Sequence, residues 1–505
     1  MNAASLLRHK GYWFFVIGVL YTLIYFQTFT ANYAYLDEIH QLWNNRDNSN
    51  RDMFLTQGRL FTGLLFDKAF RSLTAIEQLK GLRLFSLGGW VLTTWLWSVL
   101  FAHWVRILGW TENILWLSTL FLVCSASVAI CIGWASCMEL FLAIGFGLLA
   151  GHTLFVATAA RSEKRRLPIG ALLLSLALGV VSLFWYQTAY GAFLLPFLFW
   201  FIKGRGRIDR VLTIGLGAYL LTYIIYYGLF QLSLQAYGVP ASDRTGISLD
   251  VLGKIGFFFS GPLPQAFSLN WLYSSSSVVA QVLYIGVFIG WVVTVFRGGT
   301  GTTVAYKLRY LVGVLFLLAL IYLPGMIAKE NFSSYRTLFV VNLSVFILVL
   351  HDVLGRIQKD TARKAATLLL AIYLLFTGIY NYNIQFVNPV KREYAALSTY
   401  FRQHYTADKL TVHFIRADRK LFNTLYGTRV IKDEFGAPSS SRDWVPEPLI
   451  RQLLTEMTGS REAARRVTVV QYETRDQYTQ SGPAAEGKTL LMDANEILRA
   501  YESSR

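Results

Sequence analysis

The chain has 505 residues, of which 54% are hydrophobic and only 15% charged, against about 25% charged in soluble proteins. This composition excludes a string of soluble domains and predicts a polytopic α-helical membrane protein. The 47 Lys and Arg against 30 Asp and Glu would suggest a nucleic-acid partner in a soluble protein, so the positions of the positive charges need explaining. The three cysteines show neither a metal-ligand spacing nor a disulfide framework.

Apolar stretches along the chain predict about eleven membrane-spanning helices, since a bilayer needs about 20 mostly apolar residues for each helix. The stretches cover residues 11–30, 84–104, 114–134, 138–160, 167–184, 187–202, 211–229, 276–296, 310–328, 337–353 and 365–381. The first is too long for a cleaved signal peptide and is interpreted as a retained span. Glycine and proline residues between 255 and 275 predict an interfacial or re-entrant segment before the eighth span.

Lysine and arginine predict the orientation of these spans, because cytoplasmic loops carry an excess of both. Eighteen of them fall in alternate short loops, at 1–10, 105–113, 161–166, 203–210, 297–309 and 354–364. The short loops between, near 135–137, 185–186 and 329–336, hold only Lys329 and Arg336. We therefore expect the N-terminus inside and the C-terminus outside. The positive excess is then mostly a topology signal, and no nucleic-acid partner is expected.

Three longer segments would lie outside the cytoplasm. They are a first outer loop at 31–83, a second at 230–275, and the tail at 382–505. The tail has a soluble charge density, with helix-like patterns at 393–405 and 446–457 and strand-like patterns at 410–415 and 467–471. It predicts a small extracytoplasmic α/β domain after a membrane module at 1–381.

The first outer loop begins with two adjacent carboxylates, Asp37 and Glu38, a few residues after the first span. A carboxylate at this depth would accept the proton of an attacking hydroxyl if the substrate is presented at the membrane surface. The alternative is a solvated acidic pair at a helix end. Farther along, apolar residues recur every three or four positions from Leu60 to Phe70, which predicts a helix in the interface plane.

The acidic pair, the downstream Gln57-Gly58-Arg59, and the later Tyr186-Gln187 resemble the Gtr-type O-antigen glucosyltransferases. These belong to the GT-C class of polytopic, polyprenyl-phosphate-dependent glycosyltransferases. The resemblance covers roughly the first 380 residues, and it implies a GT-C-like fold with an acidic residue of the first outer loop at the catalytic centre. The family often has two Asp at this pair, whereas the second residue here is Glu38. The resemblance therefore assigns the role of catalytic base to Asp37 as the first choice and to Glu38 as the second.

Basic residues of the outer loops are candidates for binding the carrier phosphate. Arg336 is the first choice, because a planar guanidinium suits phosphate. Arg59 and Lys329 are further candidates, and Arg244 and Lys254 in the second outer loop are weaker ones. The alternatives are an ion pair of Arg336 within its own loop, with the glutamate at 330, and a phospholipid head-group contact for Arg59.

Other polar residues near the outer surface are candidates for binding donor or acceptor sugar. Glu139 stands at the outer start of a span, and Tyr186, Gln187 and Tyr190 lie in an outer hairpin of an uncharged stretch. Polar groups at such depths need partners, so the alternatives are a cation beside Glu139 and a hairpin that satisfies its own backbone. His40 follows the acidic pair and is a further sugar-binding candidate. No second His or Cys lies near it in the sequence, so a metal site is not supported, although some GT-C enzymes use a divalent ion.

The resemblance implies transfer of a single sugar, with glucose expected, from polyprenyl phosphate to a hydroxyl of a cell-surface glycan such as the O-antigen of lipopolysaccharide. The mechanism predicts inversion, and no cofactor is expected. The enzyme would be a multi-pass protein of a bacterial inner membrane acting on the extracytoplasmic side. The alternatives are a lipid or sugar transporter or flippase, and an O-antigen polymerase or ligase.

Overall fold

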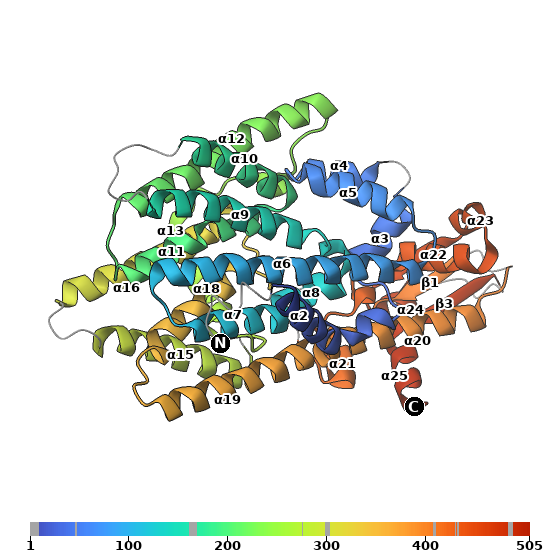
Figure 1. The fold of residues 1–505 in the computed structure, drawn as a ribbon. Helices are drawn as coiled ribbons and strands as arrows, with labels where there is room; N and C mark the ends of the chain where they lie inside the picture. Colours follow the sequence, from blue (N-terminus) through green and yellow to red (C-terminus); the bar gives the residue numbers. More distant parts are fainter. Residues whose placement is uncertain are drawn as a thin grey trace.

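The structure is a computed structural model that describes residues 10–45, 48–160, 169–274, 276–297, 303–407, 411–429, 431, 434–482 and 488–505. The positively charged loop expected at 161–166, most of 1–10 and the first residue of the strand expected at 410–415 lie outside these residues. The longest helices run in the same general direction, and the strands gather with the C-terminal helices at one end of them (Figure 1).

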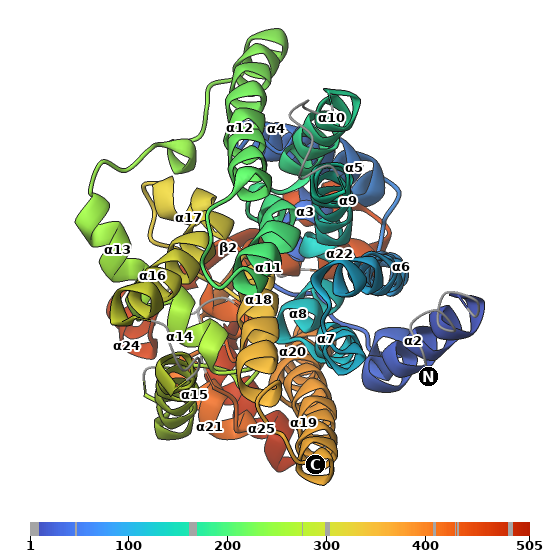
Figure 2. The ribbon, with the colours of Figure 1, turned by 60° about the vertical axis from the view of Figure 1, so that its left-hand side comes forward.

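The regular elements in the described part of the N-terminal half are helices. Its elements are α2 (Lys10–Ile24), η1 (Phe26–Phe29), α3 (Asp37–Trp43), α4 (Ser49–Leu55), α5 (Leu60–Arg71), η2 (Ile76–Gln78), α6 (Leu79–Leu108), α7 (Glu112–Cys124), α8 (Ala126–Gly133), η3 (Ala135–Cys137), α9 (Leu140–Ala159), α10 (Ile169–Trp185), η4 (Gln187–Leu194), α11 (Leu195–Lys203), α12 (Arg210–Tyr237) and η5 (Asp243–Thr245). In Figure 2, α2 lies at the margin of the bundle, where it contacts α6 and α7.

The C-terminal half adds more helices and three strands. Its elements are α13 (Val251–Ser260), α14 (Pro262–Phe267), α15 (Val278–Arg297), α16 (Val304–Ile321), α17 (Leu323–Ile327), α18 (Phe339–Val349), η6 (Leu350–Leu354), α19 (Asp360–Ile379), η7 (Tyr380–Val387), α20 (Asn388–His404), β1 (Thr411–Ile415), α21 (Arg419–Tyr426), η8 (Ser439–Ser441), α22 (Pro446–Thr458), α23 (Arg461–Arg465), β2 (Thr468–Tyr472), α24 (Arg475–Gln480), β3 (Thr489–Asp493) and α25 (Ala494–Ser503).

Seven helical segments of the described chain are long and apolar enough to cross a membrane: Ile76–Leu108, Glu112–Gly133, Ala135–Ala159, Arg210–Tyr237, Val278–Arg297, Val304–Ile321 and Asp360–His404. Three other predicted spans correspond to shorter apolar helices, Gly11–Ile24, Ile169–Trp185 and Phe339–Leu354. The structure thus agrees with a helical membrane protein, and eleven crossings stay a prediction.

The span predicted at 187–202 differs most from the structure. It consists of the 3₁₀ helix η4 followed by the nine-residue helix α11. Gly191 packs so closely on α16 that an added Cβ would lie 2.2 Å from the carbonyl oxygen of Ile321. Pro196 stands in the first turn of α11, where its missing N–H costs least. This stretch is therefore a tightly packed, irregular segment rather than one helix.

The boundary predicted at 381–382 falls inside a continuous helical segment. Residues Asp360–His404 run through α19, the π-helical η7 and α20 without a break. Pro389 again occupies a first turn. The π-helical stretch before it widens the spacing of the backbone hydrogen bonds to five residues without ending the helix. A continuous helix, and not a loop, thus connects the tail to the last apolar helix.

The strands β1, β2 and β3 form a parallel sheet in the order β2-β1-β3. Strands β1 and β2 lie where the strand-like patterns predicted them, whereas β3 was not predicted. Helix α22 of the C-terminal segment packs on α3 of the first outer loop. Gln452 Nε2 donates to the carbonyl of Thr74 at 2.8 Å, and Arg461 donates to the carbonyl of Trp43. The C-terminal segment therefore covers the loop that carries the acidic pair.

Candidate functional site

Glu38 is fully buried and both of its carboxylate oxygens have donors. Oε2 accepts from Arg83 Nη2 at 2.5 Å and from the backbone N–H of Tyr35 at 2.7 Å. Oε1 accepts from the backbone N–H of Ala135 at 2.5 Å. Arg83 is equally buried, donates to the carbonyl of Tyr33 and stacks on its ring. Glu38 thus ties the first outer loop to α6 and to η3.

Asp37 has a different environment at the first turn of α3. Its side chain is half-buried, and Oδ1 accepts from Trp444 Nε1 of the C-terminal segment at 3.1 Å. Leu36, just before it, has φ of 44°, a left-handed conformation that is costly for a branched residue. The N–H of Leu36 donates to Ser439 Oγ at 3.2 Å. The C-terminal segment thus holds the strained turn that presents Asp37, and a strain of this kind is common at active sites.

Arg336 lies against the 134–139 segment, just before α18. Its guanidinium carbon is 4.4 Å from the centre of the Trp134 ring, and Nη1 is 3.6 Å from Cys137 Sγ. Its ion-pair partner is the fully buried Glu434, at 3.7 Å from Nε, and not the glutamate of its own loop. Glu434 also accepts the backbone N–H of Tyr335 at 2.5 Å and that of Arg336 at 3.1 Å. A buried carboxylate therefore orients both the side chain and the backbone of Arg336.

Arg59 is held by the two residues that the sequence singled out in the outer hairpin. Its guanidinium carbon is 4.1 Å from the centre of the Tyr186 ring, and Nε donates to Gln187 Oε1 at 3.2 Å. Gln187 Nε2 in turn donates to the carbonyl of Gln57 at 2.7 Å and to Tyr226 Oη at 2.9 Å. These contacts fix the direction in which the Arg59 guanidinium points.

Glu139 lies between the two arginines. It is buried just before α9, and both Arg59 and Arg336 are within Coulomb range of its carboxylate. Among the described residues, its Oε2 has no hydrogen-bond partner. A buried acceptor left without a donor costs free energy, so this oxygen is a candidate acceptor for a hydrogen bond from water or a bound group.

The 134–139 segment joins Glu38 and its neighbours on α3 to this cluster. Trp134 contacts the Tyr35 ring, with centroids 5.5 Å apart, on one side and Arg336 on the other. Ala135 binds Glu38, Ser136 Oγ donates to Gln41 Oε1 at 2.7 Å, and Glu139 ends the segment. Five of the residues predicted from separate parts of the sequence thus form one cluster: Arg59, Glu139, Tyr186, Gln187 and Arg336.

The remaining predicted residues lie elsewhere or have other roles. Tyr190 is fully buried, stacks on Tyr219 and donates to Thr222 Oγ1 at 2.8 Å, so both its ring and its hydroxyl contact α12. Lys329 and Arg244 have exposed side chains in two loops that pair with each other, and no described contact joins them to the cluster.

His40 is half-buried beside Asp37. Burial lowers the pKa of its imidazole, although Asp37 opposes the shift. Its ring is therefore neutral at neutral pH. Within the described part of the chain, no group of three His, Cys, Asp or Glu is placed to hold a metal ion.

Sequence reasoning missed Arg83, Glu434, Arg442 and Trp444. Arg83 adjoins an apolar span, where a charge needs a partner, and that signal was available. Trp444 is 407 residues from the Asp37 that it contacts, and nothing in its local sequence marks it. Arg442, which lies within Coulomb range of Asp37, is equally unmarked.

The cluster lies at the end of the apolar helices where the C-terminal segment packs (Figure 1). The fold and site therefore define a helical protein with membrane-length apolar helices and a charged, partly buried site at one end of them. No protein-family model, curated protein or solved structure matches the chain.

Proposed function

We propose that the protein is a GT-C-type glycosyltransferase of a bacterial inner membrane. It transfers one sugar, expected to be glucose, from a polyprenyl-phosphate carrier to a hydroxyl of a cell-surface glycan outside the cytoplasm. The observation that carries the proposal is the 134–139 segment, which contacts Tyr35 and Glu38, close to Asp37 in the chain, on one side and the guanidinium of Arg336 on the other. It ends at Glu139, which is within Coulomb range of both Arg59 and Arg336. Transfer of a sugar from a lipid carrier requires the catalytic base and the phosphate-binding site to lie at the same depth relative to the membrane.

Asp37 is the base in this proposal, and Glu38 is a structural residue. Both oxygens of Glu38 are occupied by Arg83 and by backbone donors, so a proton transfer there would break a buried ion pair. Asp37, by contrast, is half-buried and accepts a hydrogen bond from Trp444 Nε1 at 3.1 Å. It takes the proton of the acceptor hydroxyl as that oxygen bonds to the anomeric carbon of the donor.

Arg336 and Arg59 bind the phosphate of the carrier. The bond from the anomeric carbon to the phosphate oxygen breaks as the new glycosidic bond forms, and polyprenyl phosphate leaves with the electron pair. Guanidiniums suit this phosphate because they offer several N–H donors in a plane. Glu139, with its unpaired oxygen between the two arginines, accepts a hydroxyl hydrogen bond from the donor sugar. A single displacement of this kind inverts the anomeric centre.

The test is transfer of radiolabelled glucose from polyprenyl phosphate in membrane vesicles that contain the lipid-linked glycan. The Asp37→Asn protein should lose about 10²–10⁴-fold in rate, as expected for loss of a general base. Asp67→Asn is the matched control, since Asp67 lies in the same outer loop and pairs with Arg71 at its surface.

Unimpaired transfer by Asp37→Asn would reject the base assignment. A flippase or transporter would instead move the labelled lipid across the vesicle membrane without releasing polyprenyl phosphate. Measuring released polyprenyl phosphate and translocated lipid in the same vesicles therefore separates the two classes of protein.

A further inference from the structure

A second charged pocket lies at the other end of the helices. It has a volume of about 300 Å³ and lies among the turn between α6 and α7, the turn between α11 and α12, the ends of α15 and α16, and η6. Helix α16 begins at the end of the bundle away from the strands (Figure 1). The glycosyltransferase proposal makes no use of this pocket.

The inner part of the pocket is built on a buried carboxylate, Asp352. Its Oδ2 accepts from Trp291 Nε1 at 2.8 Å and from Tyr310 Oη at 3.1 Å. Its Oδ1 is 2.9 Å from His351 Nδ1, and the His351 ring packs against the Trp110 ring at a tilt of 37°, with centroids 4.5 Å apart. The contact with Asp352 at Nδ1 fixes the orientation of the His351 ring. Both residues lie on the π-helical η6, a geometry often found at functional sites.

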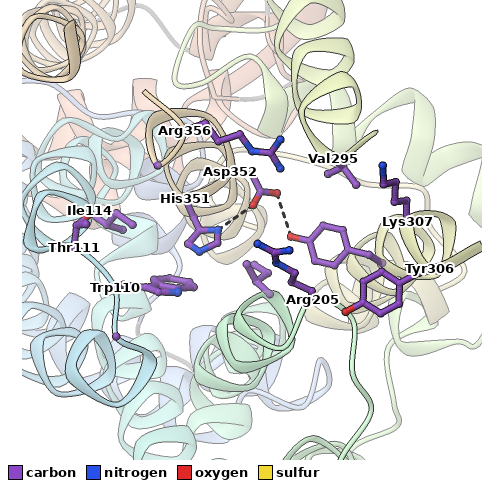
Figure 3. Close-up of a pocket in the computed structure, with 14 residues that line it drawn as sticks. Trp110, Thr111, Ile114, Arg205, Val295, Tyr306, Lys307, His351, Asp352 and Arg356 are labelled. Carbon is purple, nitrogen blue, oxygen red and sulfur yellow. Dashed lines mark hydrogen bonds and ion pairs between the residues drawn. The ribbon is translucent and has the colours of Figure 1, made fainter. Parts of the chain in front are cut away.

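Three cations surround this centre: Arg205, Lys307 and Arg356. Figure 3 shows Arg205 and Arg356 on opposite sides of the His351–Asp352 pair. Arg205 has φ of 48°, so its side chain projects from a left-handed turn that costs free energy. Three cations around one carboxylate leave the pocket positively charged, with an aromatic wall at Trp110 and Tyr306.

We propose that this pocket binds a phosphate group. Two guanidiniums that line one cavity match the charge and the donor geometry of phosphate. Lys307 adds a third positive charge, with its Nζ donating to the carbonyl of Phe296 at 2.5 Å. Exposed apolar side chains lie close by in sequence, Phe296 on α15 and Leu308 on α16, so an acyl chain attached to the phosphate has an apolar surface to follow. Basic pockets between membrane helices bind lipid head groups in this way. The phosphate comes from an anionic phospholipid or from inorganic phosphate in solution.

The competing explanation is that these cations only set the membrane orientation, since this end of the chain carries the excess of Lys and Arg expected inside. Arg297 and Arg309 separate the two explanations. They belong to the same end of α15 and α16, have exposed side chains and do not line the pocket. If the arginines only set the orientation, replacing either pair would have the same effect on lipid binding. If the pocket binds phosphate, only the replacement of Arg205 and Arg356 would weaken binding.

The experiment uses the full-length protein in a non-ionic detergent, titrated with phosphatidylglycerol or with phosphatidylcholine of the same acyl chains and followed by native mass spectrometry. Phosphatidylglycerol should bind more tightly. The double variant Arg205→Gln, Arg356→Gln should bind it about a hundredfold more weakly, at about tenfold for each charge-assisted contact. The double variant Arg297→Gln, Arg309→Gln should bind it like the unaltered protein.

Equal loss in both double variants, or no loss in either, would overturn the proposal. Competition with inorganic phosphate distinguishes the sources. If millimolar inorganic phosphate displaces the lipid, the ligand of the pocket is phosphate itself. If the lipid stays bound, the ligand is the phosphate group of a lipid. Folding is checked by the thermal unfolding of each variant, which should be unchanged because the substituted side chains are exposed.

Discussion

Asp37 and Glu38 are adjacent in the sequence, yet the structure gives them opposite environments. Glu38 is buried in an ion pair with Arg83, whereas Asp37 is half-buried and bonded to Trp444. The sequence predicted that one of the two acts as a base but could not separate them. The difference between the two environments depends on Arg83 and Ala135. They bind Glu38 but lie 45 and 97 residues from it in the sequence.

Glu38→Gln should destabilise the protein much more than Asp37→Asn. The amide leaves the buried Arg83 guanidinium without its counter-charge, and breaking a buried pair in this way costs about 3–5 kcal/mol. Thermal unfolding of the purified variants in detergent measures the difference. A Glu38→Gln protein that unfolds at the same temperature as the unaltered protein but has lost transfer would instead assign the base to Glu38.

Arg336→Lys should lower kcat/KM for the lipid-linked sugar by about tenfold or more, because a lysine keeps the charge but loses the planar set of donors. The lysine also loses the stacking on Trp134. Lys329→Gln is the control from the same outer loop, since its side chain is exposed, and it should leave kcat/KM unchanged. The reverse ranking of these two variants would move the phosphate site to Lys329.

At the scale of elements, the apolar pattern located most of the helices, because hydrophobic length is a local property. It failed at 187–202, where Gly191 makes a backbone contact with α16, and at 381, where η7 carries the helix onward. Both depend on tertiary packing. The C-terminal segment was expected as a separate domain, but it contacts the first outer loop and holds part of the site.

The C-terminal segment should therefore contribute to turnover. Glu393 on α20 accepts from the N–H groups of Ser439 and Ser440 at 2.9 and 2.8 Å, which fixes the stretch that leads to Trp444. Trp444→Phe removes the hydrogen bond to Asp37 and should lower kcat by about tenfold, with little change in KM for the donor.

Tyr472→Phe is the matched control for Trp444→Phe. It removes one hydrogen bond in the same segment, to His413, at a place that does not contact Asp37. Steady-state kinetics of both variants should separate them. Equal kcat values for the two variants would reject a role for Trp444 in the reaction.

At the scale of the whole molecule, the two charged regions lie at opposite ends of the helices. The sequence explained the net charge of +17 mainly as a topology signal, and that interpretation places Asp37 outside and Arg205 inside. The pocket around Asp352 was not predicted, because its lining comes from five separate turns and helix ends whose cations had already been assigned to topology.

The most direct test of the proposed site is an electron cryo-microscopy structure of the Asp37→Asn protein with polyprenyl-phosphate glucose bound. The variant should keep the donor intact because the base is missing. We predict the carrier phosphate within hydrogen-bond distance of Arg336 and Arg59, with the sugar between Glu139 and position 37. A phosphate bound away from both arginines, for example only in the pocket of Arg205 and Arg356, would contradict the proposal.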